Sequence, residues 1–392
     1  MISKRIGDLV SSGEIVIKTG PFGTQLKAAE YVKIGTPVLN VKNLGFGKVV
    51  NSKLDRVAED TLSRLSAHIL CSGDIVFGRK GAVDRHAYIS ETENGWMQGS
   101  DCIRLRVNSE KINSRYLSYY FLTSGHKAFM ISMCSHGTTM ASLNQKILEQ
   151  IEFPCPDIQT QNRIVALLES IDTRILLNEK INDNLQQQAK ALYEEMFINN
   201  CDANTTSGTL SDIAIITMGQ SPSGSSYNED SIGEVFYQGR AEFGFRFPTR
   251  RLFTTEPKRM AEVGDVLLSV RAPVGDLNVA YERCCIGRGL GAIHSKYGNS
   301  SFVLYTMFAL RPQLDVFNGE GTVFGSINRD ALNSMPIEIP STDKIAQFEA
   351  VVRPMDELIR TNYEEICRLE ALRDSLLPKL MSGELDVSDI QL

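Results

Sequence analysis

Apolar residues recur at alternating steps of four and three residues along two long stretches of the chain. The first stretch has ten positions at this spacing from Ile164 to Met196, and the second has ten from Phe348 to Leu380; eight in each are apolar, and the polar ones are Asn178, Asn182, Asn362 and Arg373. This 3.5-residue spacing is typical of the contact seam of a coiled coil. Asp157 and Ser341, which lie just before these stretches, are suited to cap helix N-termini. The pattern predicts long helices over residues 156–200 and 341–382.

Shorter apolar runs, interrupted by Gly, Asn and Asp, fill the segment that precedes each predicted helix. Examples from the first half are GTPVLNVKNLGFGKVV and SGDIVFGRKG. Their β-branched and aromatic residues between turn-forming residues are typical of short strands. We therefore expect globular domains over residues 1–155 and 201–340, and a C-terminal tail over residues 383–392.

The two halves are related by an internal repeat. Adding 184 to a residue number aligns residues 137–197 with residues 321–381 without a gap. The identities include Ser142/Ser326, Asn144/Asn328, Leu148/Leu332, Pro156/Pro340, Asp172/Asp356, Ile175/Ile359, Asn178/Asn362 and Leu185/Leu369. Upstream, SGDIVFGRKGAVD at Ser72 resembles VGDVLLSVRAPVG at Val263 with an offset of 191, which places Arg79 and Lys80 on the part of this echo that matches Arg271.

These features predict an α+β fold with two α/β domains and two long helices that pack as an antiparallel coiled coil. Antiparallel packing would relate the halves by a pseudo-twofold axis and bring Asn178 near Asn362. Asparagines in such a seam can fix the register of two helices. The alternative is that both are partly solvated polar residues without that role.

Composition excludes several classes of protein. The 392 residues are 42% hydrophobic with a formal net charge of −6, and no apolar run is long enough to span a membrane. Residues 1–155 carry 19 Lys and Arg against 14 Asp and Glu, whereas residues 341–392 carry 6 against 11, so the acidic helices suit protein partners better than phosphate. The eight cysteines lack metal-binding spacing, which favours reduced thiols in the cytoplasm.

No motif in the sequence indicates catalysis. The chain has no phosphate-binding loop, dinucleotide-binding loop, nucleophile elbow or zinc-protease motif. We therefore expect no enzymatic activity, no catalytic residue, no metal site and no bound cofactor. A fused nuclease-methyltransferase is disfavoured for the same reason.

Two polar loops offer candidate ligand contacts near the start of the two domains, KTGPFGTQLK at Lys18 and TMGQSPSGSSYNED at Thr217. Their side chains are of the kinds that reach base edges and phosphates, although ordinary surface turns have similar compositions. Eight arginines between residues 238 and 290 add a second signal, since arginine binds guanine and phosphate, although each singly could be a solvated strand residue. The candidates are Lys18, Thr19, Gln25, Arg79, Lys80, Gln220, Ser221, Ser223, Tyr227, Gln238, Arg240 and Arg271.

Three segments resemble the DNA-specificity subunits of type I restriction-modification enzymes. QNRIVALLESIDTRILLNEKINDNLQQQAKALYEEMF and LRDSLLPKLMSGELDV are similar to the two helical regions of that family, and TMGQSPSGSSYN to the opening of one of its target recognition domains. The similarity covers essentially the whole chain. The first domain departs from it, with TGPFG in place of the GQSP pattern.

The resemblance implies a subunit without catalysis of its own, whose two target recognition domains each read half of a bipartite, asymmetric target in double-stranded DNA. The helices would set the gap between the half-sites and dock two methyltransferase (modification) subunits that use S-adenosylmethionine. Translocase-nuclease (restriction) subunits that use ATP and Mg would join for cleavage. The alternative is a two-headed scaffold that binds proteins or carbohydrate and no DNA.

Overall fold

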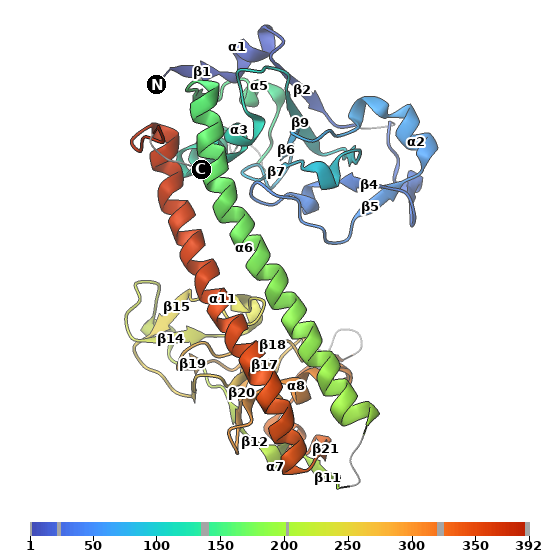
Figure 1. Cartoon of the computed structure of the whole chain (residues 1–392), viewed down its shortest axis with the longest axis vertical. Coiled ribbons are helices and arrows are strands. Elements are labelled where there is room, and N and C mark those ends of the chain that lie inside the picture. The colour runs from blue at the N-terminus through green and yellow to red at the C-terminus, as the bar shows by residue number, and fades with distance from the viewer. Residues whose placement is uncertain (1, 22–24, 135–140, 201–203, 320–324, 389–392) are drawn as a thin grey trace. The chain divides into compact units, whose positions relative to one another are not determined.

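The computed structural model describes residues 2–21, 25–134, 141–200, 204–319 and 325–388 (Figure 1). The chain divides into two compact units, unit 1 with Met1–Leu176 and Ile366–Leu392, and unit 2 with Leu177–Glu365. Unit 1 is therefore built from both ends of the chain and unit 2 from its middle. The first residues of the repeat with the offset of 184, from Gly137 and Gly321, lie outside the described residues, as do residues 22–24 of the first polar loop.

The two predicted long helices are α6 (Ile158–Tyr193), which continues as a π-helical turn over Glu194–Asn199, and α11 (Thr342–Ser382). Asp157 caps α6 as predicted, because its Oδ1 accepts a hydrogen bond from the Thr160 N–H at 2.9 Å.

Parts of α6 and α11 pack on each other within each unit, running in opposite directions (Figure 1). In unit 1 Leu168 and Leu380 share one core, and in unit 2 Tyr193 and Phe348 share another. None of the twenty predicted seam positions is exposed. The prediction of two long helices packed together is confirmed.

Unit 1 is β-rich, as its short β-branched runs predict. Its strands are β1 (Ser3–Arg5), β2 (Ile15–Thr19), β3 (Tyr31–Val32), β4 (Thr36–Leu39), β5 (Asp55–Val57), β6 (Ile75–Gly78), β7 (His86–Tyr88), β8 (Met97–Gln98), β9 (Cys102–Val107) and β10 (Glu152–Pro154). They form sheets in the orders β2-β9-β6-β7 and β3-β5-β4-β8, and β1 pairs with β10. All pairs are antiparallel except β4 with β8.

Unit 2 repeats this topology with one added strand. Its strands are β11 (Thr206–Thr209), β12 (Ala214–Met218), β13 (Tyr227–Asn228), β14 (Glu234–Tyr237), β15 (Leu252–Thr254), β16 (Met260–Ala261), β17 (Val266–Ser269), β18 (Leu277–Val279), β19 (Cys284–Ile286), β20 (Leu290–Ser295) and β21 (Pro336–Ile339). The orders are β12-β20-β17-β18 and β13-β15-β14-β19-β16, and β11 pairs with β21. The added strand is β16, which pairs with β19. The internal repeat therefore extends through the β-rich parts, where little sequence identity remains.

Shorter helices cover the sheets. They are α1 (Ile6–Ser11), α2 (Glu59–Arg64), α3 (Ser114–Tyr120), α4 (Ser124–Cys134) and α5 (Gln145–Leu148) in unit 1, and α7 (Leu210–Ile213), α8 (Ser300–Ala309), α9 (Arg311–Asp315) and α10 (Arg329–Asn333) in unit 2. In unit 1, Phe77 of β6 and Tyr116 of α3 join the core that includes α6 and α11. Each β-rich part is thereby attached to the helix pair by buried apolar surface.

A pair of equivalent aspartates also connects each β-rich part to the long helices. Asp172 Oδ2 accepts a hydrogen bond from the Tyr119 hydroxyl at 2.6 Å, and Asp356 Oδ1 accepts one from the Tyr305 hydroxyl at 3.0 Å. Arg246 Nη1 lies 2.7 Å from Asp356 Oδ1. Asp172 similarly pairs with Arg115 and Arg373. Hydrogen bonds to an ionised carboxylate are among the stronger ones in proteins, so these aspartates help to orient the β-rich parts on the helices.

The seam asparagines are buried, but each makes its hydrogen bond one turn away from the position expected. Asn362 Nδ2 donates to Asn182 Oδ1 at 2.8 Å, and Asn178 Nδ2 donates to Glu365 Oε2 at 3.0 Å. Asn178 is 2% and Asn362 is 7% exposed. The interpretation of partly solvated asparagines is therefore wrong, because both side chains lie inside the seam with polar partners.

Two histidines lie in the core of unit 1, packed around Phe121. The ring of His126 lies 4.7 Å from that of Phe121, and His86 Nε2 lies 2.9 Å from Ser118 Oγ. Burial lowers the pKa of both histidines to about 3. Both are therefore neutral in the folded protein at neutral pH.

We expect unit 1 to lose stability as the pH falls from about 6.5 towards 3. An unfolded histidine has a pKa near 6.5, whereas the folded pKa values of His86 and His126 are lower. Between these values only the unfolded state takes up a proton on each histidine. The contribution of the two neutral histidines to stability is therefore fully present above pH 6.5 and is lost as the pH falls towards 3. Each histidine lowers the free energy of unfolding by up to about 1.4 kcal/mol per pH unit. Urea unfolding followed by fluorescence of Trp96, the only tryptophan, measures this slope. His126→Leu should reduce the pH slope of the free energy of unfolding by the contribution of one histidine. An unchanged slope would contradict the explanation.

Candidate nucleic-acid interface

A close backbone crossing marks the same end of the β2-β9-β6-β7 and β12-β20-β17-β18 sheets. A Cβ on Gly20 would lie 2.0 Å from the carbonyl oxygen of Gly99, and a Cβ on Gly219 would lie 2.2 Å from that of Gly287. Only glycine allows this approach. The crossing brings the polar loop that follows β2 or β12 against the loop that precedes β9 or β20.

A short helix capped by an asparagine borders each of these sheet ends. Asn144 Oδ1 accepts a hydrogen bond from the Ile147 N–H at 3.0 Å, and Asn328 Oδ1 accepts one from the Ala331 N–H at 2.9 Å. The side chains of the first helical residues, Gln145 in α5 and Arg329 in α10, thus occupy equivalent places. The caps are the residues that the repeat aligns by identity.

The loop after β6 or β17 completes each site. Lys80 pairs with Ser142, and Arg271 pairs with Ser326, as isolated antiparallel bridges. This shared pairing makes Lys80 the structural counterpart of Arg271, as the repeated SGD and VGD segments predict.

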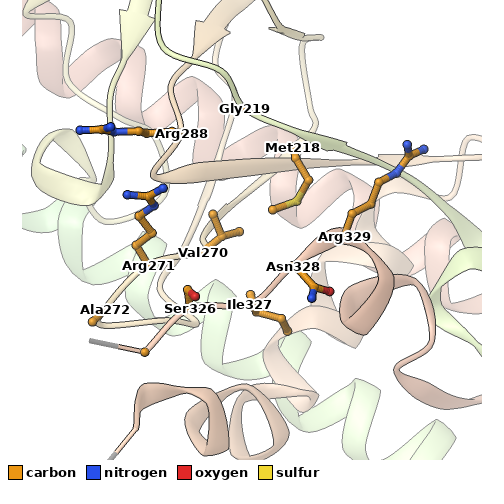
Figure 2. A pocket seen from close by; sticks show the side chains of 11 residues that line it. Met218, Gly219, Val270, Arg271, Ala272, Arg288, Ser326, Ile327, Asn328 and Arg329 are labelled. Carbon is orange, nitrogen blue, oxygen red and sulfur yellow. The ribbon is translucent and has the colours of Figure 1, made fainter. Parts of the chain in front are cut away.

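In unit 2 these elements surround a cavity of about 680 Å³, named here the second cavity (Figure 2). It is lined by Met218, Gly219, Val270, Arg271, Ala272, Arg288, Gly325, Ser326, Ile327, Asn328 and Arg329. In Figure 2 Arg271 and Arg288 lie on one side and Arg329 on the other, with Val270 and Met218 between them. Among the described residues, the lining thus combines three cations with an apolar floor and includes no acidic residue.

In unit 1 the equivalent elements surround a cavity of about 370 Å³, named here the first cavity. It is lined by Thr19, Arg79, Ile103, Asn144, Gln145 and Lys146. Gln145 Nε2 donates a hydrogen bond to Thr19 Oγ1 at 3.1 Å. The two cavities therefore share a position in the fold but differ in size and in chemistry.

Ion pairing separates the arginines between residues 238 and 290 into two groups. Five have acidic partners, namely Arg240 with Asp276, Arg246 with Asp356, Arg250 with Glu282, Arg251 with Glu242, and Arg283 with Glu234 and Glu262. Within the described ranges, Arg259, Arg271 and Arg288 form no ion pair, and neither does Arg329. All four are exposed. Three of these four available cations therefore line a single cavity.

Several residues proposed from the sequence gather around Arg288. The Arg288 N–H donates to Ser221 Oγ at 3.2 Å, and the Gln220 N–H donates to the Ile286 carbonyl at 3.0 Å. The Gly289 N–H donates to the Gln238 carbonyl at 3.2 Å. Ser221, Gln220 and Gln238 thus lie on segments that are hydrogen-bonded to Arg288 or to residues within two positions of it, and Arg288 lines the second cavity together with Arg271.

Three other candidates of unit 2 lie apart from that lining. Tyr227 donates its hydroxyl to the Pro222 carbonyl at 3.1 Å, and Ser223 contacts Ser225 within the same turn. Arg240 Nη1 lies 2.5 Å from Asp276 Oδ2 and lines another cavity, of about 480 Å³. The structure does not bring these three residues together with Arg271.

In unit 1 the structure places Thr19 and Arg79 in the first cavity and Lys80 beside it, 4.0 Å from Asp101 Oδ1. Lys18 is half-buried on β2. Gln25 is exposed, and its carbonyl accepts a hydrogen bond from Arg64 of α2 at 2.8 Å.

Four cavity residues, Arg288, Arg329, Gln145 and Lys146, are not among the candidates proposed from the sequence. Arg329 and Gln145 immediately follow the repeated asparagine caps, so the repeat itself contained a signal for them. Arg288 belongs to the arginine-rich segment, but its lack of an ion pair is visible only in three dimensions.

Among the residues that the structure describes, no helix is long and apolar enough to cross a membrane. In that same part of the chain, no group of three His, Cys, Asp or Glu side chains is arranged to hold a metal ion.

Comparison with known proteins shows similarity along the chain. Residues 3–187 match the type I restriction modification DNA specificity domain. The chain is 27% identical over 376 residues to the specificity subunit of the type I restriction enzyme MjaX of Methanocaldococcus jannaschii, covering 91% of this chain and 88% of that protein. It is 23% identical over 421 residues to the MjaIX specificity subunit of the same organism, covering 99% and 94%.

A solved structure shows the same fold. The S subunit of a type I restriction-modification system from M. genitalium aligns with a TM-score of 0.56 at 15% identity, covering 97% of this chain and 96% of that one. Two β-rich parts and two long packed helices are therefore shared with that protein.

Proposed function

Since the chain belongs to the family of non-catalytic DNA-specificity subunits of type I restriction-modification enzymes, we propose that its two units read the two halves of one bipartite, asymmetric target in double-stranded DNA. The observation that carries this proposal is the pair of cavities at equivalent sheet ends with different linings. Equivalent positions suit two similar readers, and different linings suit two different half-sites.

We further propose that residues 1–155 and 201–340 are the target recognition domains and that the helices over 156–200 and 341–382 set the unread gap, with 383–392 as a tail. In the first domain the proposed contacts are Lys18, Thr19, Gln25, Arg79 and Lys80. In the second they are Gln220, Ser221, Ser223, Tyr227, Gln238, Arg240 and Arg271. Those at the cavities have the strongest support, because nearby cations can neutralise phosphate.

Two methyltransferase subunits are the proposed direct partners. Support comes from two exposed phenylalanines at equivalent places, Phe46 at 45% and Phe245 at 50% exposure. Each follows a glycine in a loop closed by a matching bridge, Leu44 with Val49 or Phe243 with Pro248. Exposed aromatic side chains are common anchors of protein interfaces, and a pair of them suits two copies of one partner. S-adenosylmethionine would belong to those subunits, and ATP and Mg to restriction subunits that join later.

The isolated chain is expected to bind DNA weakly at about 150 mM salt. Its net charge of −6 supplies little of the phosphate neutralisation that drives affinity, so the methyltransferase subunits would add cationic surface. Titration of a labelled duplex that contains the target, with and without those subunits, measures this difference. Tight sequence-specific binding by the chain alone would refute the expectation.

Asn178 and Asn362 are proposed to fix the register of the helices and hence the gap. Replacing both by leucine removes the side chains that bond Glu365 and Asn182, and alternative registers then become accessible. The expected result in the methyltransferase complex is relaxed selectivity for the gap length among targets with the same half-sites. The control is Leu185→Ile, elsewhere in the seam. Unchanged stability together with unchanged gap selectivity would rule out the role.

Base-resolved adenine methylation of DNA from cells that express this chain with the methyltransferase subunit of its system tests the proposed function. The expected result is one new split motif with a fixed gap. Exchanging residues 201–340 for those of a relative should then change one half only. A soluble complex that methylates no motif would count against DNA reading, and failure to form any complex would favour the two-headed scaffold.

A further inference from the structure

Resting on the proposed function, we propose that the second cavity reads guanine, with Arg271 and Arg288 on the base and Arg329 on the adjoining phosphate. The DNA half-site that unit 2 reads would therefore contain at least one G·C pair, contacted from the major groove. Nothing comparable is proposed for the first cavity.

The chemistry of the lining favours a base edge. A guanidinium group is a planar fork whose two N–H groups match the O6 and N7 acceptors of guanine. Arg271 and Arg288 form no ion pair in the described part of the chain, so both forks are available for a ligand. Val270 and Ile327 line the same cavity and can exclude water from a flat ring, which strengthens the hydrogen bonds made there.

The backbones that carry these side chains are fixed. Arg271 pairs with Ser326 in a bridge, and the Arg288 N–H donates to Ser221 Oγ. A fixed backbone lowers the entropy that each arginine loses on binding a base. The arrangement is thus partly preorganised for recognition.

Arg329 differs from the other two in position. It lies on the opposite side of the cavity in Figure 2, at the first residue of α10. The guanidinium group of Arg329, set apart from those of Arg271 and Arg288, suits a phosphate next to the base that the other two contact. A phosphate contact of this kind carries no sequence information.

The counterparts in unit 1 show that these arginines are particular to one half. Lys80 replaces Arg271, and Gln145 replaces Arg329. Gly20 donates to Cys102 as Gly219 donates to Leu290, which makes Ser100 the counterpart of Arg288. The fold therefore does not require arginine at these positions, so a ligand contact is the better explanation for all three.

The test uses the full chain in complex with its methyltransferase subunits and duplexes that carry the wild-type methylated motif. Replacing guanine by 7-deazaguanine in the half-site of unit 2 removes the N7 acceptor without altering the protein. For the wild-type chain, we expect this replacement at one guanine to lower the affinity for the duplex roughly tenfold or more. Arg271→Gln or Arg288→Gln should abolish that difference, whereas Arg329→Gln should weaken all duplexes uniformly.

Arg259→Gln is the matched control, because Arg259 is also exposed and forms no ion pair in the described residues but lies outside the cavity. It should leave the 7-deazaguanine effect unchanged. A half-site without guanine would overturn the inference, as would uniform weakening by Arg271→Gln and Arg288→Gln with the 7-deazaguanine effect intact. Absence of any methylated motif in the wild type would instead refute the proposed function.

Discussion

Replacing Asp356 by alanine is expected to lower the free energy of unfolding of unit 2 by about 3–5 kcal/mol, the usual cost of leaving one partner of a buried ion pair alone. The side chain of Arg246 is only 4% exposed and has its charge paired by Asp356. The Ser301 and Tyr305 hydroxyls also donate to this carboxylate, at 2.7 and 3.0 Å. Alanine would therefore leave a cation and two hydroxyls without their acceptor.

Hydrogen exchange of peptides from β17 and β20 measures the effect, since unit 2 has no tryptophan. The matched control is Glu234→Ala, which removes one of the two acidic partners of Arg283 where the side chains are 38% and 52% exposed. That change should cost less than about 1 kcal/mol. Equal effects of the two substitutions would show that the buried pair does not hold the β-rich part on the helix.

Gly219→Ala is expected to destabilise unit 2 by about 3 kcal/mol, at the upper end of the range for overpacking. The new Cβ would lie 2.2 Å from the Gly287 carbonyl oxygen and 2.8 Å from those of Ile286 and Leu290. These oxygens belong to the backbone and cannot rotate away as a flexible side chain could. The crossing must open, which would also displace the loop that carries Arg288 and reduce methylation of the target.

Gly224→Ala tests the same change in the same loop without the crossing, because a Cβ there meets nothing within 4 Å. Its effect should be within about 0.5 kcal/mol. Gly20→Ala should repeat the large effect in unit 1, where Trp96 fluorescence reports unfolding. Similar stabilities for Gly219→Ala and Gly224→Ala would mean that the loops do not need this close approach.

The long helices could be predicted because a seam repeats one chemical requirement at a fixed spacing. Ile164 to Met196 and Phe348 to Leu380 each present one side chain per 3.5 residues, and burial of that stripe stabilises the pair. The partners of the seam asparagines were less predictable. Asn362 bonds Asn182, one turn from the residue aligned with it, because side-chain reach across the seam depends on the relative shift of the two helices.

The candidate contact residues divide in the same way. Arg271, Gln220 and Ser221 were proposed because they stand in polar loops or in the arginine-rich segment. Arg271 lines the second cavity, and Ser221 accepts a hydrogen bond from Arg288 of its lining. Arg240 has the same side chain as Arg271, but Asp276 is its partner. Composition cannot distinguish these two arginines, since the acid that neutralises Arg240 is 36 residues away.

By itself, the sequence determined the repeat, the two helices, the β-rich character of the parts between them and the resemblance to the specificity subunits, because each depends on local periodicity or on matched residues. The tertiary structure alone decided which cations remain available and which loops meet. Gly219 and Gly287 approach each other although they are 68 positions apart in the chain, and Arg271, Arg288 and Arg329 line one cavity. Such contacts join residues distant in the chain, whose distances depend on how the sheets and helices pack rather than on any local pattern.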